Sequence, residues 1–217
     1  MTNQCTDRDL LAVEPGIFTA GGFNSQRLAQ GTDGQVSGTT FTSPSADFIS
    51  AGIEPAMVLC LYTTIPTEAT CYEIISVDSA TTLTISLLRT DTEAPPLPPP
   101  PASELKYFIN TFRPQIAAEQ AELEETLRRL TEAEPISPAD FVDSRQMRSV
   151  VVFGTLARIF TARASGASSD DANWIKADFY RRQHVQALGR LRLTSDIDGD
   201  GKAEHTRDLS NINLRRI

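Results

Sequence analysis

Alternating apolar and polar positions dominate the first half of the chain. Between residues 19 and 90, runs rich in Thr, Val, Ile and Phe are separated by Gly, Asp, Asn and Pro. In the last run, 81–88, Leu83, Ile85 and Leu87 fall on one side of the chain. Short strands that recur about every ten residues with turn residues between them are typical of a small antiparallel barrel or sandwich. The predicted strands are 34–38, 39–42, 56–62, 72–77 and 81–88, with one more at 107–109.

Two segments interrupt this pattern. Residues 47–49 predict a single helical turn, after which Gly52 supplies the positive φ that a tight return into the next strand needs. Residues 94–101 contain six prolines in eight positions, a composition that excludes helix and central strand and favours a stiff polyproline spacer. A ligand for an SH3-type domain is the sharper alternative for the same segment.

From Pro114 onward the spacing of apolar residues becomes helical, with alternating steps of four and three. Acidic residues occur early in this first helix and basic residues late, which matches the helix dipole. Its apolar face carries Ile116, Gln120, Leu123, Leu127 and Leu130.

A second helix is predicted to begin with Ser137 as N-cap and Pro138 at the first helical position, and to end near Ala164. Its centre, 150–156, is apolar almost all round, as in a helix buried among others. Gly154 within that centre would allow another helix to approach closely.

A third helix is announced by the Ser and Asp residues at 168–171. We interpret His184 as a packing histidine on the apolar stripe of this helix rather than a catalytic one. The stripe consists of Trp174, Ala177, Tyr180, His184, Leu188 and Leu191, and the other side holds Lys176, Arg181, Arg182 and Arg190.

These patterns together predict an α+β fold, in which a small antiparallel β-barrel or sandwich precedes a helical bundle with an extended C-terminal tail. The predicted domains are an N-terminal arm at 1–18, a β domain at 19–112, a helical bundle at 113–194, and an Asp/Gly turn with C-terminal extension at 195–217.

Charge is divided unevenly between the two halves. Residues 1–112 hold four basic and twelve acidic side chains, and residues 113–217 hold sixteen of each, so the net charge of −8 comes from the first half. A protein that reads duplex DNA would normally present a net basic face, and none is visible in the composition. Arginine outnumbers lysine by 17 to 3, which favours bidentate pairing at interfaces. The candidates for a subunit interface are Arg181, Arg182 and Arg190.

Catalytic motifs are missing from the sequence. There is no nucleophile elbow, phosphate loop, zinc-protease motif or dinucleotide fingerprint, so we expect no enzymatic activity. The three cysteines have no CxxC spacing and are expected to be reduced and mostly buried. No stretch approaches the roughly 18 apolar residues of a membrane span, and the first residues lack the character of a secretory signal.

One segment has the spacing of a calcium loop. Its odd-position carboxylates can converge on one hard cation, and Gly201 permits the sharp bend between them. Position twelve of such a loop should be a bidentate acid, but here it is Arg207. A plain Asp-Gly turn is therefore the alternative to a calcium site. The candidate ligands are Asp196, Asp198, Asp200, Lys202 and Glu204.

The second half of the chain combines an apolar helix at 148–156, a helix with an acidic start at 170–182, and the segment 191–201 with an Arg-rich end. In these segments it resembles the head-to-tail connector, or adaptor, proteins of tailed bacteriophages. Segments 32–34, 47–53 and 80–86 are similar to small β domains of phage neck and tail proteins.

The resemblance implies a structural virion protein made in the host cytoplasm. It would form a dodecameric ring beneath the portal in the virion neck, join the portal to a stopper, tail terminator or other neck protein, and let DNA pass without sequence-specific binding during genome ejection. A different neck component and a calcium-dependent protein- or glycan-binding module are the alternative functions.

The C-terminal segment would reach into the portal in such a protein; the alternative is that it completes its own domain. Its alternating apolar residues and basic end suit the addition of a strand to the edge of a partner. The residues of this candidate docking tail are Leu209, Ile212, Leu214, Arg215, Arg216 and Ile217.

Overall fold

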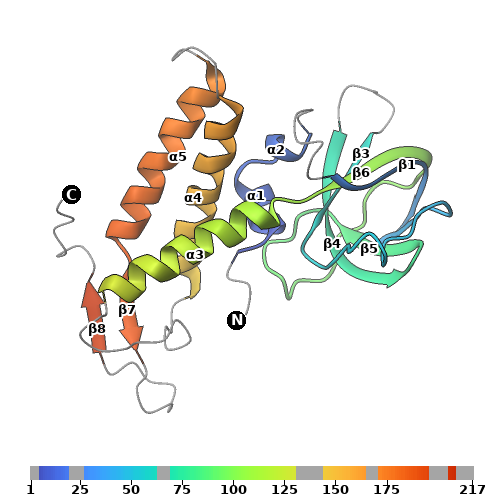
Figure 1. The fold of residues 1–217 in the computed structure, drawn as a ribbon. Helices are drawn as coiled ribbons and strands as arrows, with labels where there is room; N and C mark the ends of the chain where they lie inside the picture. Colours follow the sequence, from blue (N-terminus) through green and yellow to red (C-terminus); the bar gives the residue numbers. More distant parts are fainter. Residues whose placement is uncertain are drawn as a thin grey trace. The chain divides into compact units, whose positions relative to one another are not determined.

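The computed structural model describes residues 5–19, 27–62, 69–130, 144–164, 171–195 and 205–208. The chain divides into two compact units, which we call the barrel unit (Thr6–Phe112) and the helical unit (Arg113–Ile217 together with Met1–Cys5). Strands dominate the first unit and helices the second (Figure 1). The expected α+β class is therefore confirmed.

The strands of the barrel unit close into an antiparallel barrel in the order β1-β2-β5-β4-β3-β6 (Figure 1). Of the two architectures that the alternation predicts, the chain thus forms the barrel. β6 pairs with both β1 and β3, so the strand that follows the proline-rich segment closes it. The strands are β1 (Arg27–Ser37), β2 (Thr40–Thr42), β3 (Val58–Tyr62), β4 (Ala69–Ser79), β5 (Thr82–Ser86) and β6 (Ala102–Asn110).

The first strand begins at Arg27, well before the predicted start at residue 34. The alternation that marks the other strands is lost in its first half because glycine occupies a core-facing place. Gly31 lies opposite Tyr107 of β6, and a Cβ atom at Gly31 would collide with the Tyr107 ring. The glycine therefore makes room for a large side chain of the neighbouring strand.

Aromatic side chains fill one end of the barrel core. Phe41 and Tyr107 meet edge to face with 5.1 Å between ring centroids, and Phe48 packs against both. The Tyr107 hydroxyl lies 3.0 Å from Ser43 Oγ, so its polar end is satisfied inside the core. The remaining core consists of aliphatic residues from the inner faces of the strands, among them Leu59, Leu61, Ile74, Leu83, Ile85 and Ile109.

Two short helices, α1 (Asp7–Val13) and α2 (Gly16–Thr19), precede the barrel and pack on it. Asp7 accepts hydrogen bonds from the Thr111 hydroxyl at 2.7 Å and from the Phe112 amide at 2.8 Å. The ring of Phe18 meets that of Phe112 edge to face at 5.1 Å. Most of the predicted N-terminal arm is thus helical and belongs to the barrel unit.

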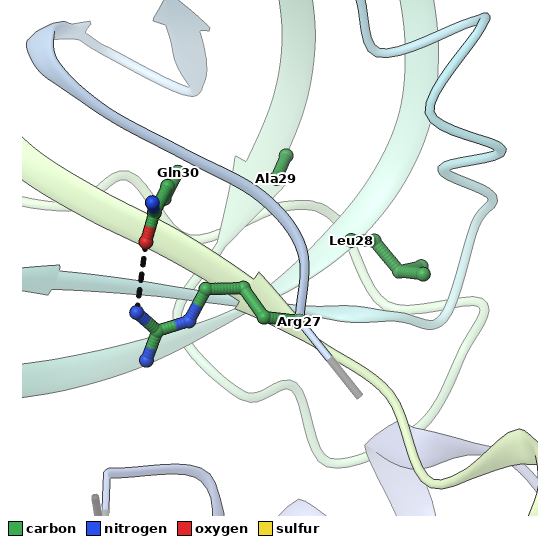
Figure 2. A pocket seen from close by; sticks show the side chains of 4 residues that line it. All are labelled: Arg27, Leu28, Ala29 and Gln30. Carbon is green, nitrogen blue, oxygen red and sulfur yellow. Dashed lines mark hydrogen bonds between the residues drawn. The ribbon is translucent and has the colours of Figure 1, made fainter. Parts of the chain in front are cut away.

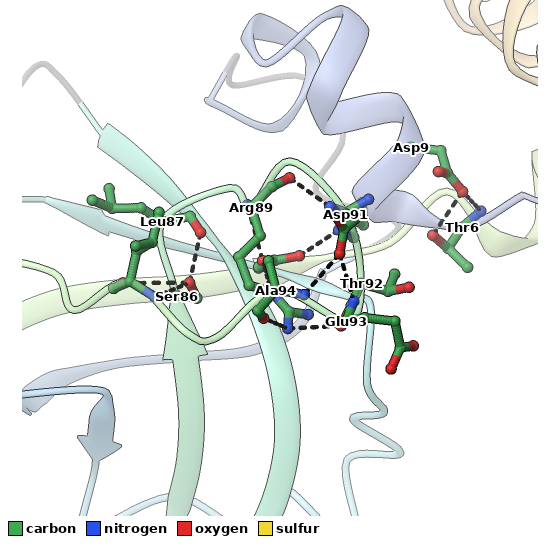
Figure 3. A network of polar contacts seen from close by, with 12 residues as sticks. Thr6, Asp9, Ser86, Leu87, Arg89, Asp91, Thr92, Glu93 and Ala94 are labelled. Carbon is green, nitrogen blue, oxygen red and sulfur yellow. Dashed lines mark hydrogen bonds and ion pairs between the residues drawn. The ribbon is translucent and has the colours of Figure 1, made fainter.

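A network of polar contacts connects α1 with the barrel and with the loop after β5, in which Arg89 lies (Figure 3). Glu73 of β4 accepts from Arg8 Nε at 2.5 Å and from Arg89 Nε at 2.6 Å, and all three side chains are at least nine-tenths buried. Arg8 also donates to the carbonyl of Arg89, and Arg89 donates to the carbonyls of Thr92 and Ala94. The one buried carboxylate therefore pairs with two arginines, and both arginines also donate to backbone carbonyls.

The two predicted interruptions are both visible in the barrel unit. Residues 47–52 form a single turn in which the Ala51 amide donates to the Asp47 carbonyl, and Gly52 has a φ of +69°, as expected. The proline-rich segment has neither helix nor strand. It is attached to the end of β5, because the Leu97 amide donates to Ser86 Oγ at 2.8 Å and the Leu87 amide donates to the Leu97 carbonyl.

The helical unit contains α3 (Arg113–Leu130), α4 (Ser144–Arg163) and α5 (Ala172–Gly189), and α4 packs against both of the others. The predicted end of the second helix is confirmed, while its expected start at Ser137 and Pro138 lies outside the described residues. Asp171 caps α5 by accepting from the Asn173 amide at 2.8 Å, as its sequence indicates. Strands β7 (Arg192–Ser195) and β8 (His205–Asp208) then form an antiparallel pair that the sequence did not predict.

Glu119 of α3 joins the three helices from a nearly buried position. Its carboxylate accepts from Arg158 Nε of α4 at 2.5 Å and lies 3.6 Å from His184 Nδ1 of α5. The same ring nitrogen is 3.0 Å from the Val150 carbonyl, so His184 has the partner expected of a packing histidine. Gly154 of α4 admits the Glu119 side chain, since a Cβ atom at Gly154 would collide with its carboxyl group. The predicted close approach at this glycine is confirmed.

Candidate subunit interface

Helix α5 is apolar on two opposite sides. Toward α4 it presents Ala177 and Tyr180, both buried, and the Tyr180 ring stacks on Phe160 with 5.6 Å between centroids. Its other side carries four large apolar side chains that remain exposed. Their exposed fractions are 39% for Trp174, 59% for Ile175, 50% for Phe179 and 59% for Val185.

Helical spacing explains how these four side chains come together. Residues three and four apart lie on the same side of a helix, so Ile175 and Phe179 are neighbours. Val185 lies at nearly the same angular position as Trp174, three turns further along, and borders the side that carries Ile175 and Phe179. Trp174 lies at the border between the two sides. Large apolar side chains on a helix are normally buried against another element, yet nothing among the described residues covers this outer side of α5.

All three predicted interface arginines are exposed. Arg182 lies one turn from Phe179 on the outer side, Arg181 lies at its border beside Val185, and Arg190 follows the end of α5. Arg182 forms an ion pair with Asp178, one helical turn away. Among the described residues, the side chains of Arg181 and Arg190 have no hydrogen-bonding or charged partner. The outer side and its border thus combine apolar side chains with positive charge that has no partner among the described residues.

A second exposed surface of the helical unit has the opposite character. Helix α3 exposes Ala117, Ala118 and Ala121, and beside them lie the exposed Glu122 and the half-buried Glu125. The Glu122 side chain remains 65% exposed although it accepts from Arg158. Glu125 is paired with Arg128 on its own helix at 2.8 Å. Small apolar residues flanked by carboxylates are complementary to large apolar residues flanked by arginines.

The sequence pattern indicates the arginines of α5 as interface residues but does not indicate its outer apolar residues. It also places Trp174 on the packing stripe, whereas 39% of this side chain is exposed. The prediction was incomplete because it assumed a single apolar stripe on the helix. Apolar residues at 175, 179 and 185, out of phase with that stripe, were the signal that could have revealed the second side.

The other predicted sites fall on undescribed parts of the chain. The candidate calcium ligands Asp196, Asp198, Asp200, Lys202 and Glu204 lie outside the described residues, as does the candidate docking tail at 209–217. The register Ser195↔His205 shows that residues 196–204 connect two paired strands. No group of three or more metal-ligating side chains occurs within the residues that the structure describes.

A pocket of about 470 Å³ lies along the start of β1 (Figure 2). Arg27 is the charged residue among the described lining residues, and its guanidinium is already engaged. It lies over the Phe108 ring at 4.6 Å, donates to Gln30 Oε1 at 2.9 Å, and contacts Asn110 Oδ1 at 3.4 Å. The arginine therefore supports the barrel wall.

No family model matches this chain, and no significant match was found among curated proteins or solved structures. In the described parts, none of the helices has the length and apolar character required to span a membrane. The outer side of α5 is therefore the candidate site that the residues themselves single out.

Proposed function

We propose that this chain is a structural subunit of the neck of a tailed-bacteriophage virion, a head-to-tail connector that forms a closed ring of identical copies. The observation that carries this proposal is the exposed apolar side of α5. Four large apolar side chains on one helix are costly to leave in water. A second copy of the chain is the occupant we assign to them.

The complementary surface on α3 supports a second copy as the occupant. The α5 side of one copy would meet the α3 side of the next, with large apolar residues against alanines and Arg181 near the carboxylates of Glu122 and Glu125. Two different surfaces of the same subunit would then be in contact. Such a heterologous contact repeats from copy to copy and forms a ring when its rotation closes.

The neck location rests on the sequence resemblance and on charge. In this proposal α3, α4 and α5 belong to the helical bundle of the connector, and residues 209–217 dock into the portal. The acidic first half would leave DNA free to pass, because it offers few positive charges to hold phosphates. The partners would be the portal above the ring and a stopper, tail terminator or other neck protein below it.

The self-assembly is tested with a matched pair of isoleucines. Ile175 on α5 is 59% exposed and Ile49 on the barrel unit is 63% exposed, so either can be replaced by Glu without opening a core. We expect purified wild-type chain to form closed rings by native mass spectrometry and electron microscopy. Ile175→Glu should raise the concentration needed for half-assembly by about tenfold or more, because a charge replaces an apolar contact.

Ile49→Glu should assemble like the wild type. A wild-type chain that stays monomeric at all soluble concentrations would sink the self-assembly proposal, and equal effects of the two substitutions would remove α5 from it. The neck location is tested separately. The gene should lie among phage head and tail genes, and gold-labelled antibodies against the chain should decorate the collar of that phage's particles.

A further inference from the structure

Two of the three cysteines face each other on adjacent strands of the barrel. Cys60 of β3 and Cys71 of β4 are direct cross-strand partners, and their sulfur atoms lie 2.6 Å apart. The two cysteines are held opposite each other by the strands themselves, because the register of β3 and β4 is continuous from Val58↔Glu73 to Tyr62↔Ala69. The barrel therefore holds the two thiols together.

The register also places the two cysteines at a non-hydrogen-bonded position of the strand pair, where the distance between α-carbons suits a disulfide. The Ile74 amide donates to the Met57 carbonyl at 2.9 Å, so Met57 and Ile74 form a hydrogen-bonded pair. Hydrogen-bonded and non-hydrogen-bonded pairs alternate along antiparallel strands, which makes Cys60 and Cys71 a non-hydrogen-bonded pair. The α-carbons of such pairs are about 4.5 Å apart, within the range that a disulfide spans without moving the backbone.

We propose that Cys60 and Cys71 form an intramolecular disulfide that joins β3 to β4 when the protein meets a small-molecule disulfide such as oxidised glutathione. This is a modification site in the barrel unit and is independent of the assembly proposed for α5. It also separates these two cysteines from Cys5, which has no place in the strand pairing.

The environments of the two thiols assign their roles in the reaction. Cys60 is fully buried beside α2, with its sulfur 3.9 Å from the Phe18 carbonyl. Burial raises the pKa of the Cys60 thiol, and its contact with Cys71 adds to the effect. Cys71 is only partly buried. The external reagent therefore reaches Cys71 first, and Cys60 is the resolving thiol.

The exchange balances in two steps. The Cys71 thiolate attacks one sulfur of the reagent disulfide, forming a Cys71–reagent bond and releasing one reagent thiolate. The Cys60 sulfur then attacks Cys71 and displaces the second reagent thiol, which leaves with the Cys60 proton. Two protein thiols are oxidised to one disulfide, and one reagent disulfide is reduced to two thiols.

The bond should stabilise the barrel. It would close the short loop between β3 and β4 and so restrict the unfolded chain, while the folded strands already have the required spacing. We expect the midpoint of thermal unfolding of the barrel to rise by roughly 5 °C. A reducing agent such as dithiothreitol should reverse the change.

Peptide mapping of the full-length protein tests the assignment. After incubation with oxidised glutathione, the thiols titrated in denaturant should fall from three to one, and the mass should drop by two hydrogens. Trypsin has no Lys or Arg site between Arg27 and Arg89 and leaves both cysteines in one peptide. Cleavage after Glu68 by a glutamate-specific protease should then yield two peptides that stay linked until they are reduced.

Single substitutions supply the controls. Cys60→Ala and Cys71→Ala should abolish both the linked peptide and the rise in melting temperature, and Cys5→Ala should keep both. Three titratable thiols after oxidation, a stable glutathione adduct on Cys71 beside a free Cys60, or a bond to Cys5 would each overturn the proposal. Peptide mapping of the wild-type protein decides the outcome, so the test remains valid even if one variant folds poorly.

Discussion

The two units of this chain differ in where they expose large apolar side chains: the barrel unit exposes them in several separate places, and the helical unit exposes them on one helix. In the barrel unit, the described large apolar side chains that remain exposed occur at the end of α1, in the turn at 47–52, and in the loop after β5. In the helical unit, those that remain exposed all lie on α5. They are Val13, Ile49, Leu87, Leu88 and Leu97 in the barrel unit, and Trp174, Ile175, Phe179 and Val185 in the helical unit.

The charged groups follow the same division. The barrel unit buries Glu73 between Arg8 and Arg89 and leaves none of the three unpaired. The helical unit pairs Glu119 internally but leaves Arg181 without a partner among the described residues. Substitutions in the barrel unit should therefore change stability, whereas those on the outer side of α5 should change assembly.

The contrast can be measured because each unit has its own reporter. Trp174 is the only tryptophan of the chain and lies on α5, so tryptophan fluorescence follows the helical unit. The Cys60 thiol is fully buried in the barrel unit, so in a Cys71→Ala background, where no disulfide can form between the two strands, its reaction with an alkylating reagent follows the opening of the barrel. Each prediction can then be assigned to one unit.

The largest effect is expected for Glu73→Gln. This substitution keeps the shape of the side chain but leaves two buried arginines without a counter-charge, at a cost of about 3 kcal/mol. In urea, Cys60 should become reactive at a lower denaturant concentration, while the Trp174 transition should stay where it is. Glu93→Gln, at an exposed position in the loop after β5, is the matched control and should be neutral. Equal shifts of both reporters would contradict the division into two self-contained units.

A smaller loss of stability, this time in the helical unit, is expected for Gly154→Ala. Alanine favours a helix over glycine by about 1 kcal/mol, but here its methyl group would displace Glu119 from Arg158. Overpacking of this kind costs about 1–3 kcal/mol, so we expect a net loss of about 1 kcal/mol in the Trp174 transition. Gly189→Ala, where a Cβ atom meets nothing within 4 Å, should be neutral or slightly stabilising. A Gly154→Ala protein as stable as Gly189→Ala would show that Glu119 is free to move.

Much of the barrel could be predicted from its sequence because alternation survives where side chains line a core. Leu83 and Ile85 of β5 are fully buried, as their spacing indicates. The start of β1 was missed because Gly31 replaces an apolar residue in order to admit Tyr107. Helix α1 was missed because it is short and is held by Asp7, whose partners Thr111 and Phe112 lie far away in the sequence.

The candidate interface was only partly predictable for a different reason. A periodic stripe identifies the side of a helix that packs within its own unit, and Ala177 and Tyr180 were found in that way. A second apolar stripe on the same helix does not pack within the unit. The sequence alone therefore cannot show whether it is exposed; that requires the arrangement of the three helices. The cross-strand meeting of Cys60 and Cys71 likewise required the register of β3 and β4. The calcium loop and the docking tail remain predictions.

The smallest effect concerns a polar contact at the rim of the barrel. The hydroxyl of Ser43 donates to Asp33 at 2.6 Å and the amide of Ser45 at 2.8 Å. These hydrogen bonds, that of Ser43 first, lower the pKa of Asp33 from 3.8 to about 2. Because the pKa is lower in the folded state, the ionised carboxylate contributes stability above about pH 4, and this contribution is lost as the pH falls toward 2.

Asp33→Asn should therefore melt slightly below the wild type at neutral pH, with a difference that shrinks between pH 4 and pH 2. Titration of the carboxyl by NMR checks the cause directly, since its midpoint should lie near 2 and should rise toward 3.8 in Ser43→Ala. A midpoint near 3.8 in the wild type would mean that this rim carboxylate is not held by the chain itself. The barrel unit, like the outer side of α5, would then expose a group that lacks an internal partner. The two units would differ less in how completely their exposed groups are paired within the unit.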